Sequence, residues 1–208
     1  MQKCVIYIHG KGGSADEAEH YKPLFADFDI IGMDYQTQTP WEAKTEFTRF
    51  FAEISAKYEQ IVIVANSIGA FFAMHALNDR KISEAFFISP IVNMENLIKN
   101  MLKYANVTEA ELQKKEIIQT EFGETLSWEY LNWVQNNLIN WRVPTHILYG
   151  NNDNLQSLKD IENFAAKIGA DVTVMNSGEH WFHTGEQMRF LDNWIINRRN
   201  KQIYLKTT

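Results

Sequence analysis

The sequence predicts an α/β fold, a three-layer α/β/α arrangement in which helices cover both faces of one mainly parallel, six-stranded sheet. Short apolar runs recur along the chain, and segments with helical spacing of apolar residues separate them. The runs are continuous and do not alternate with polar residues, which is typical of strands buried on both faces. Strands that alternate with helices favour parallel pairing through right-handed crossovers.

Six runs are short enough to be single strands and are rich in β-branched and aromatic residues. They are Cys4 to Ile8, Ile30 to Met33, Ile61 to Ala65, Ala85 to Ile88, His146 to Tyr149 and Val172 to Met175. After the last strand, apolar residues repeat at helical spacing from Gly185 to Arg199. We expect a helix there, with Arg198 and Arg199 in its last turn, where cations complement the helix dipole.

The composition fits one globular domain spanning residues 1–208, with 45% apolar residues to form its core. A net charge of -6 argues against a nucleic-acid partner, because phosphate binding needs a basic face. The single cysteine, Cys4, cannot form an internal disulfide, and no run approaches the length of a membrane span. We therefore expect a cytoplasmic protein with no membrane partner, and find no signal for an oligomeric state.

The connection from Pro90 to Val143 is about twice the usual crossover length, which indicates an insertion. Apolar residues in it repeat at helical spacing in two sets. These are Met94, Leu97, Ile98, Met101 and Leu102, and then Tyr130, Leu131, Val134, Leu138 and Trp141. We expect a small helical cap at about 93–140 that roofs a small apolar pocket.

Ser67 lies at a small-x-Ser-x-Gly turn between an apolar strand and an apolar helix, Ile68 to Leu77. Such a sharp turn requires small residues on both sides of the serine, and Ala65 and Gly69 meet that requirement. The turn lifts the serine hydroxyl clear of the sheet, as a nucleophile requires. The alternative is that Ser67 only caps the helix. His75 in that helix is interpreted as a core residue.

A second motif, His9 to Ser14, follows the first strand and contains three glycines that let the backbone turn sharply. A glycine-rich loop also suggests phosphate binding. The P-loop spacing is absent and the dinucleotide signature is incomplete at Ala15. Asp34 at the end of the second strand could imitate a ribose-binding acid, so a nucleotide-binding module remains an alternative.

Together, His9–Gly13 and Ala65–Gly69 resemble the motifs of the α/β-hydrolase family. Ala65 stands where that family more often has glycine, and the family's usual first two antiparallel strands are missing. The resemblance implies a parallel sheet in the order second, first, third, fourth, fifth and sixth strand. In that order the His9 loop and the Ser67 turn face each other where the strand order reverses, which is where open α/β sheets bind ligands.

The resemblance also implies a catalytic triad in the order serine, acid, histidine. Ser67 would be the nucleophile, Asp153 in Gly150–Asp153 the acid and His180 in the loop after the sixth strand the base. The chemistry needs these residue types, because imidazole can take the serine proton and a carboxylate fixes its tautomer. The backbone amides of Lys11 and Ile68 would form the oxyanion hole.

We assign substrate contacts to His9, Gly10 and Trp181. Two alternatives concern the triad. Asp153 could cap a helix starting near Leu155, and His180 with His183 could suggest zinc, although two ligands without a third make a poor metal site. We expect no metal.

The sequence thus predicts a serine hydrolase that cleaves a small carboxylic ester or thioester through an acyl-enzyme intermediate. It needs no cofactor, and its partner is a small-molecule substrate. Amidases and peptidases also use such sites, and a non-catalytic small-molecule binder is the alternative from another class.

Overall fold

The computed structural model describes residues 2–207, with side chains described for residues 2–200. The chain divides into two compact units, which are treated separately below. The main unit comprises the chain up to Ile91 and from Asn140 onward, and the insertion unit is Val92–Ile139. The insertion unit lies at the connection that the sequence marks as unusually long.

The main unit contains all the strands of the large sheet. Its elements are β1 (Lys3–Ile8), the 3₁₀ helix η1 (Ala15–Phe25), β2 (Asp29–Gly32), α1 (Pro40–Ser55), β3 (Gln60–Asn66), α2 (Ser67–Ala76), β4 (Glu84–Ile88), β7 (Thr145–Gly150), α6 (Leu158–Ile168), β8 (Asp171–Met175) and α7 (Gly185–Thr207). The six strands pair in the order β2-β1-β3-β4-β7-β8, and every pair is parallel. The predicted fold class and strand order are confirmed.

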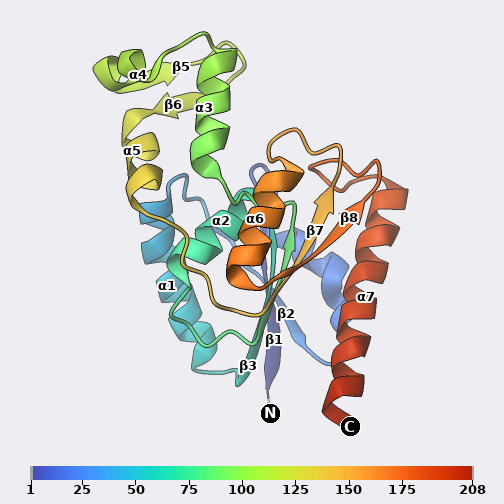
Figure 1. Cartoon of the computed structure of the whole chain (residues 1–208). Helices are drawn as coiled ribbons and strands as arrows, with labels where there is room; N and C mark the ends of the chain where they lie inside the picture. Colours follow the sequence, from blue (N-terminus) through green and yellow to red (C-terminus); the bar gives the residue numbers. More distant parts are fainter. Residues whose placement is uncertain (1, 208) are drawn as a thin grey trace. The chain divides into compact units, whose positions relative to one another are not determined.

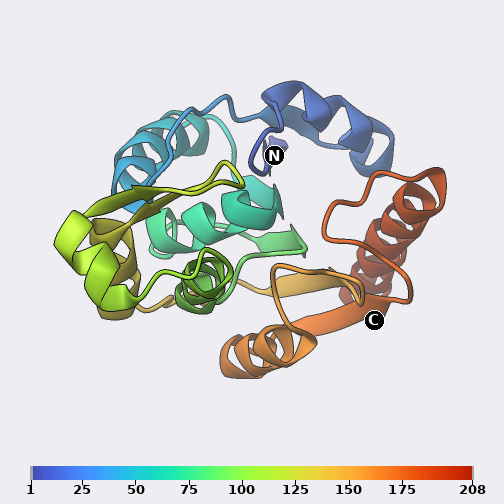
Figure 2. The ribbon, with the colours of Figure 1, turned by 90° about the horizontal axis from the view of Figure 1, so that it is seen from above.

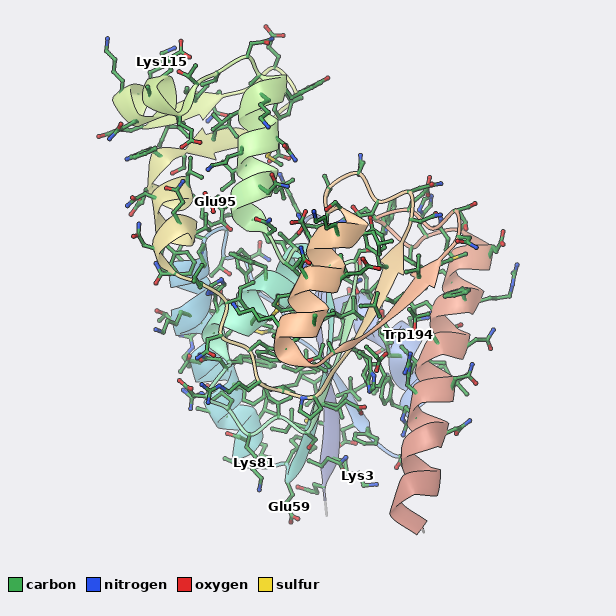
Figure 3. All side chains as sticks on the ribbon, in the orientation of Figure 1. Lys3, Glu59, Lys81, Glu95, Lys115 and Trp194 are labelled. Atoms are coloured by element: carbon green, nitrogen blue, oxygen red, sulfur yellow. The ribbon has the colours of Figure 1, made fainter. Side chains whose placement is uncertain are left out.

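Helices cover both faces of this sheet, with η1 and α7 on one face and α1, α2 and α6 on the other (Figures 1 and 2). Side chains of successive strand residues point to opposite faces. Val5 and Tyr7 of β1 therefore join one core cluster with Tyr21 of η1 and Trp194 of α7. Figure 3 labels Trp194 on α7, beside the sheet.

Helix α2 is buried over most of its length, as expected for an apolar helix packed at the centre of the sheet. Its Phe72 meets Phe47 of α1 with ring centroids 6.3 Å apart. His75 packs against Phe71 at 4.6 Å, and burial lowers the pKa of His75 to about 4. A half-buried imidazole packed on an aromatic ring supports the interpretation of His75 as a core residue.

Helix α7 continues to Thr207, so the prediction that it ends near Arg199 is wrong. The two arginines lie inside the helix and form ion pairs at 2.7 Å, Arg198 with Asp171 and Arg199 with Asp27. Both aspartates lie elsewhere in the main unit, so these arginines tie α7 to the rest of the fold. Among the described residues no helix, α7 included, is long and apolar enough to cross a membrane.

The insertion unit contains α3 (Met94–Tyr104), α4 (Glu109–Lys115), β5 (Ile117–Gln119), β6 (Thr125–Ser127) and α5 (Trp128–Asn136). The expectation of helices alone is incomplete, because β5 and β6 form an antiparallel hairpin. Gly123 in its turn has φ +86°, a conformation that glycine adopts without strain. Helix α5 ends before Leu138, which is 78% exposed. The predicted extension of this helix to Trp141 is therefore wrong.

Candidate active site

Ser67 lies where β3 passes directly into α2, and its backbone has φ +50°. This left-handed conformation is unfavourable for serine, and such outliers cluster at functional sites. The turn also brings backbones very close, because a Cβ atom on Gly69 would lie 2.2 Å from the carbonyl oxygen of His9. The capping position of α2 belongs to Asn66, so Ser67 is not the helix N-cap.

Three predicted residues from three different loops form one hydrogen-bonded line. The Oγ atom of Ser67 lies 2.8 Å from Nε2 of His180, and Nδ1 of His180 lies 2.7 Å from Oδ2 of Asp153. Asp153 follows β7, and His180 lies in the loop after β8. The side chain of Asp153 is 0% exposed and that of His180 is 15% exposed. A hydroxyl, an imidazole and a buried carboxylate are thus aligned at the carboxyl edge of the sheet.

The second oxygen of the Asp153 carboxylate is also satisfied. Oδ1 accepts hydrogen bonds from the amides of Leu155 (2.8 Å) and Gln156 (3.1 Å). Helix α6 begins only at Leu158, with Ser157 as its N-cap, so the alternative in which Asp153 caps a helix starting near Leu155 does not apply. These local bonds fix the carboxylate in place while Oδ2 faces the imidazole.

Two glycines hold the acid loop against the histidine loop. A Cβ atom on Gly150 would lie 2.4 Å from the carbonyl carbon of Gly178, so neither loop could approach so closely with larger residues there. The amide of Asn152 donates to the Gly178 carbonyl (2.8 Å), and the amide of Ser177 donates to Oδ1 of Asn151 (2.6 Å). These contacts were not predicted from the sequence, although glycines beside both motifs were a visible signal.

The His9 loop lies beside the Ser67 turn, because Ile8 of β1 pairs with Ala65 of β3. A Cβ atom on Gly10 would lie 3.2 Å from Cβ of Ser67. The imidazole of His9 is buried and stacks on Tyr35 at 4.2 Å, and the Tyr35 hydroxyl donates to the His9 carbonyl (2.7 Å). Tyr35 supports this loop and was not predicted.

One candidate oxyanion donor, Ile68, directly follows Ser67, and the other, Lys11, lies in the His9 loop after the neighbouring strand β1. Ile68 is in the first turn of α2, where amides have no acceptor within the helix. Lys11 belongs to a turn that the amide of Gly13 closes on the carbonyl of Gly10 at 3.1 Å.

The remaining candidates lie in the histidine loop. Trp181 is 71% exposed, and its ring stacks on that of His183 at 4.5 Å. Nδ1 of His183 lies 2.7 Å from the carbonyl oxygen of Trp181, so this histidine is engaged within its own loop. In the part of the chain that the structure describes, no group of three or more His, Cys, Asp or Glu residues is placed to hold a metal ion.

No protein-family model and no curated protein matches the sequence. Solved structures do match in fold. Alpha/beta hydrolase domain-containing protein 10 from mouse has a TM-score of 0.75 at 16% identity, over 95% of this chain and 90% of that one. Est1E from Butyrivibrio proteoclasticus has a TM-score of 0.73 at 14% identity, over 98% and 88%. An esterase from Pyrococcus furiosus has a TM-score of 0.62 at 17% identity, over 96% and 81%. With the parallel sheet order described above, these likenesses show that the chain has the α/β-hydrolase fold.

Proposed function

We propose that this protein is a serine hydrolase that cleaves a small carboxylic ester or thioester. The observation that carries the proposal is the hydrogen-bonded line from Ser67 through His180 to Asp153. A serine hydroxyl becomes a nucleophile at neutral pH only when a base takes its proton. The line supplies that base at hydrogen-bonding distance, together with the carboxylate that orients it.

In the proposed reaction, Asp153 accepts a hydrogen bond from the N–H at Nδ1 of His180 and stays ionised, which keeps Nε2 unprotonated and able to accept a proton. As Oγ of Ser67 attacks the substrate carbonyl, its proton passes to Nε2. The imidazolium then protonates the departing alcohol or thiol, and Ser67 keeps the acyl group. Water attacks the acyl-enzyme with His180 again acting as base, which releases the carboxylic acid and restores the serine.

The negative charge that develops on the carbonyl oxygen needs donors that are already in place. We assign this role to the backbone amides of Ile68 and Lys11. The position of Ile68 in the first turn of α2 supports the assignment, because that helix end also carries a partial positive charge. The close approach of Gly10 to Ser67 supports the contribution of the His9 loop.

The nucleotide-binding alternative is disfavoured by the surroundings of the glycine loop. A Cβ atom on Gly13 would lie 2.9 Å from Oε1 of Glu17, so a carboxylate lies directly against this loop. A negative side chain at that position repels phosphate, whereas hydrolysis of a neutral ester is compatible with it. The simple binder is disfavoured too, because binding alone does not require a buried carboxylate aligned with an imidazole and a hydroxyl.

Hydrolysis of p-nitrophenyl esters from acetate to palmitate tests the proposal. We expect wild-type turnover to be greatest for short and medium acyl chains, and Ser67→Ala to lower kcat by roughly 10³- to 10⁶-fold. Ser55→Ala, near the end of α1, is the matched control and should behave as wild type. Near-normal turnover by Ser67→Ala would reject the proposal. Matched thioester and anilide substrates identify which bond is preferred.

A further inference from the structure

Three side chains next to the candidate nucleophile form a second hydrogen-bonded line. Nδ2 of Asn66 donates to the hydroxyl oxygen of Tyr7 at 2.9 Å, and the Tyr7 hydroxyl donates to the carboxylate of Glu17. Asn66 ends β3, Tyr7 lies in β1 and Glu17 lies in η1. Tyr7 is 1% exposed and stacks on Tyr21 at 5.1 Å. The line therefore passes through the core of the main unit.

This line joins the two segments that hold the proposed reaction centre. Asn66 is bonded directly to Ser67, so its position fixes where the serine turn begins. At the other end, the Glu17 carboxylate lies against Gly13, with Oε1 2.9 Å from where a Cβ atom would be. The line connects the Ser67 turn to the His9 loop without using His180 or Asp153.

The direction of the hydrogen bonds in this line is fixed. Burial raises the pKa of Tyr7 above its ordinary value, so the phenol stays protonated. Its single proton goes to Glu17, which as a carboxylate can only accept. The Tyr7 oxygen must then accept from Asn66, and this orients the Asn66 amide with Nδ2 toward Tyr7.

This orientation of the Asn66 amide leaves its oxygen without a hydrogen bond in the described part of the chain, which destabilises the fold and suggests a functional role. Oδ1 of Asn66 is buried and has no hydrogen-bond partner among the residues that the structure describes. A buried acceptor without a donor destabilises a protein, and such atoms in native structures call for an explanation. Ser67 itself, one residue along, is held at φ +50°. Both unfavourable features lie at one turn and need surrounding contacts to hold them.

We propose that Tyr7 is a positioning residue, which through Asn66 and Glu17 holds the Ser67 turn in place against the His9 loop. The inference rests on the proposed function, because the nucleophile and the oxyanion donors lie in those two segments. A displacement of about 1 Å in a reactive group can lower a rate by about 10²-fold. Loss of the Tyr7 hydroxyl should therefore slow the reaction without weakening substrate binding.

The experiment compares Tyr7→Phe with Tyr21→Phe, which removes a hydroxyl from the neighbouring buried ring. Two rates are measured where circular dichroism shows every variant folded: the phosphonylation of Ser67 by a fluorophosphonate, and the hydrolysis of p-nitrophenyl butyrate. We expect Tyr7→Phe to lower the phosphonylation rate and kcat by about 10- to 100-fold, with KM within about twofold. Tyr21→Phe should change all three values by no more than about twofold.

Glu17 lies at the exposed end of the line and provides a test that spares the core. Glu17→Gln keeps an oxygen that can accept the Tyr7 proton and should retain most of the rate, whereas Glu17→Ala should lower it as Tyr7→Phe does. Should Tyr7→Phe fail to fold, this pair decides the question.

Equal rates for Tyr7→Phe and Tyr21→Phe would overturn the inference, and so would equal rates for Glu17→Ala and Glu17→Gln. If wild-type Ser67 is still labelled in that case, the proposed function stands. Absence of labelling and turnover in the wild type would overturn both.

Discussion

Two histidines lie at opposite edges of the same sheet, one paired with one carboxylate and the other with two. His180 is at the carboxyl edge, between Asp153 and the hydroxyl of Ser67. His146 is at the amino edge, where Nε2 lies 2.8 Å from Glu84 and Nδ1 contacts Asp171. Lys3, Glu59 and Lys81 mark this amino edge in Figure 3.

The partners of His146 make it unsuitable as a base. Burial by itself lowers the pKa of His146, but the hydrogen bonds to Glu84 and Asp171 more than offset this and raise the pKa above its ordinary value. An imidazolium donates hydrogen bonds from both ring nitrogens, and here a carboxylate accepts from each of them. Arg198 pairs with Asp171 at 2.7 Å and extends the cluster. This histidine is therefore part of an ion-pair cluster that joins β4, β7, β8 and α7.

His180 differs in having one hydroxyl and one carboxylate as partners. A neutral imidazole that donates to Asp153 can accept the proton of Ser67, which a doubly paired imidazolium cannot do. The comparison teaches that burial and a nearby carboxylate do not identify a catalytic histidine. The partner on the second nitrogen decides whether the ring can act as a base or only as a cation.

The largest expected effect separates the two histidines by activity. His180→Ala should lower kcat/KM for p-nitrophenyl butyrate by at least about 10³-fold, because Ser67 would lose its proposed base. His146→Gln should stay within about threefold of wild type at a temperature where it is folded. Comparable losses of kcat/KM in the two variants would show that His180 and His146 do not differ in function as described.

Asp153→Asn is expected to have the next largest effect. The asparagine side chain has about the same volume as aspartate, but its amide group can donate a hydrogen bond to Nδ1 of His180. This favours the wrong imidazole tautomer and should lower kcat by up to about 10⁴-fold. Steady-state kinetics would show the loss in kcat. Full activity would mean that the carboxylate has no role in orienting His180.

The pH dependence of the free energy of unfolding tests the structural role of His146. Because the folded pKa of His146 is raised, its contribution is fully present below the ordinary value of 6.5 and is lost as pH rises through the folded pKa. We expect His146→Gln to lower the free energy of unfolding by about 1 to 3 kcal/mol at pH 6. Urea unfolding should show a smaller difference at pH 9. A difference that grows with pH would contradict the raised pKa.

The smallest effect is expected at His183. Its imidazole is bonded within its own loop and stacks on Trp181, so His183→Ala should keep kcat within about threefold of wild type. The same ester assay measures it. A loss as large as that of His180→Ala would assign the base three residues further along the chain.

The sequence predicts the sheet well, because continuous β-branched runs leave few alternatives to buried parallel strands. It fails in the insertion unit. Strands β5 and β6 are only three residues long, too short to show a period, and only Gly123 marks the turn between them. Helix α5 was extended too far because Leu138 and Trp141 keep the helical spacing by chance.

The candidate site was predictable wherever a motif was local. Ser67, Asp153 and His180 each follow a strand, so one sheet edge brings them together. The contacts that support them are tertiary and leave no local pattern, as with Tyr35 under His9 and Tyr7 under Asn66. The amino-edge cluster did leave a signal, because Glu84, His146 and Asp171 all lie at the starts of adjacent strands.

The reactivity of Ser67 toward a fluorophosphonate tests the central claim most directly. Mass spectrometry of the intact chain and of its peptides should show a single adduct on Ser67 in the wild type and in His146→Gln. The account predicts no adduct in Ser67→Ala and a labelling rate at least about 10²-fold slower in His180→Ala. Labelling at another serine, or equal labelling rates in His180→Ala and His146→Gln, would contradict it.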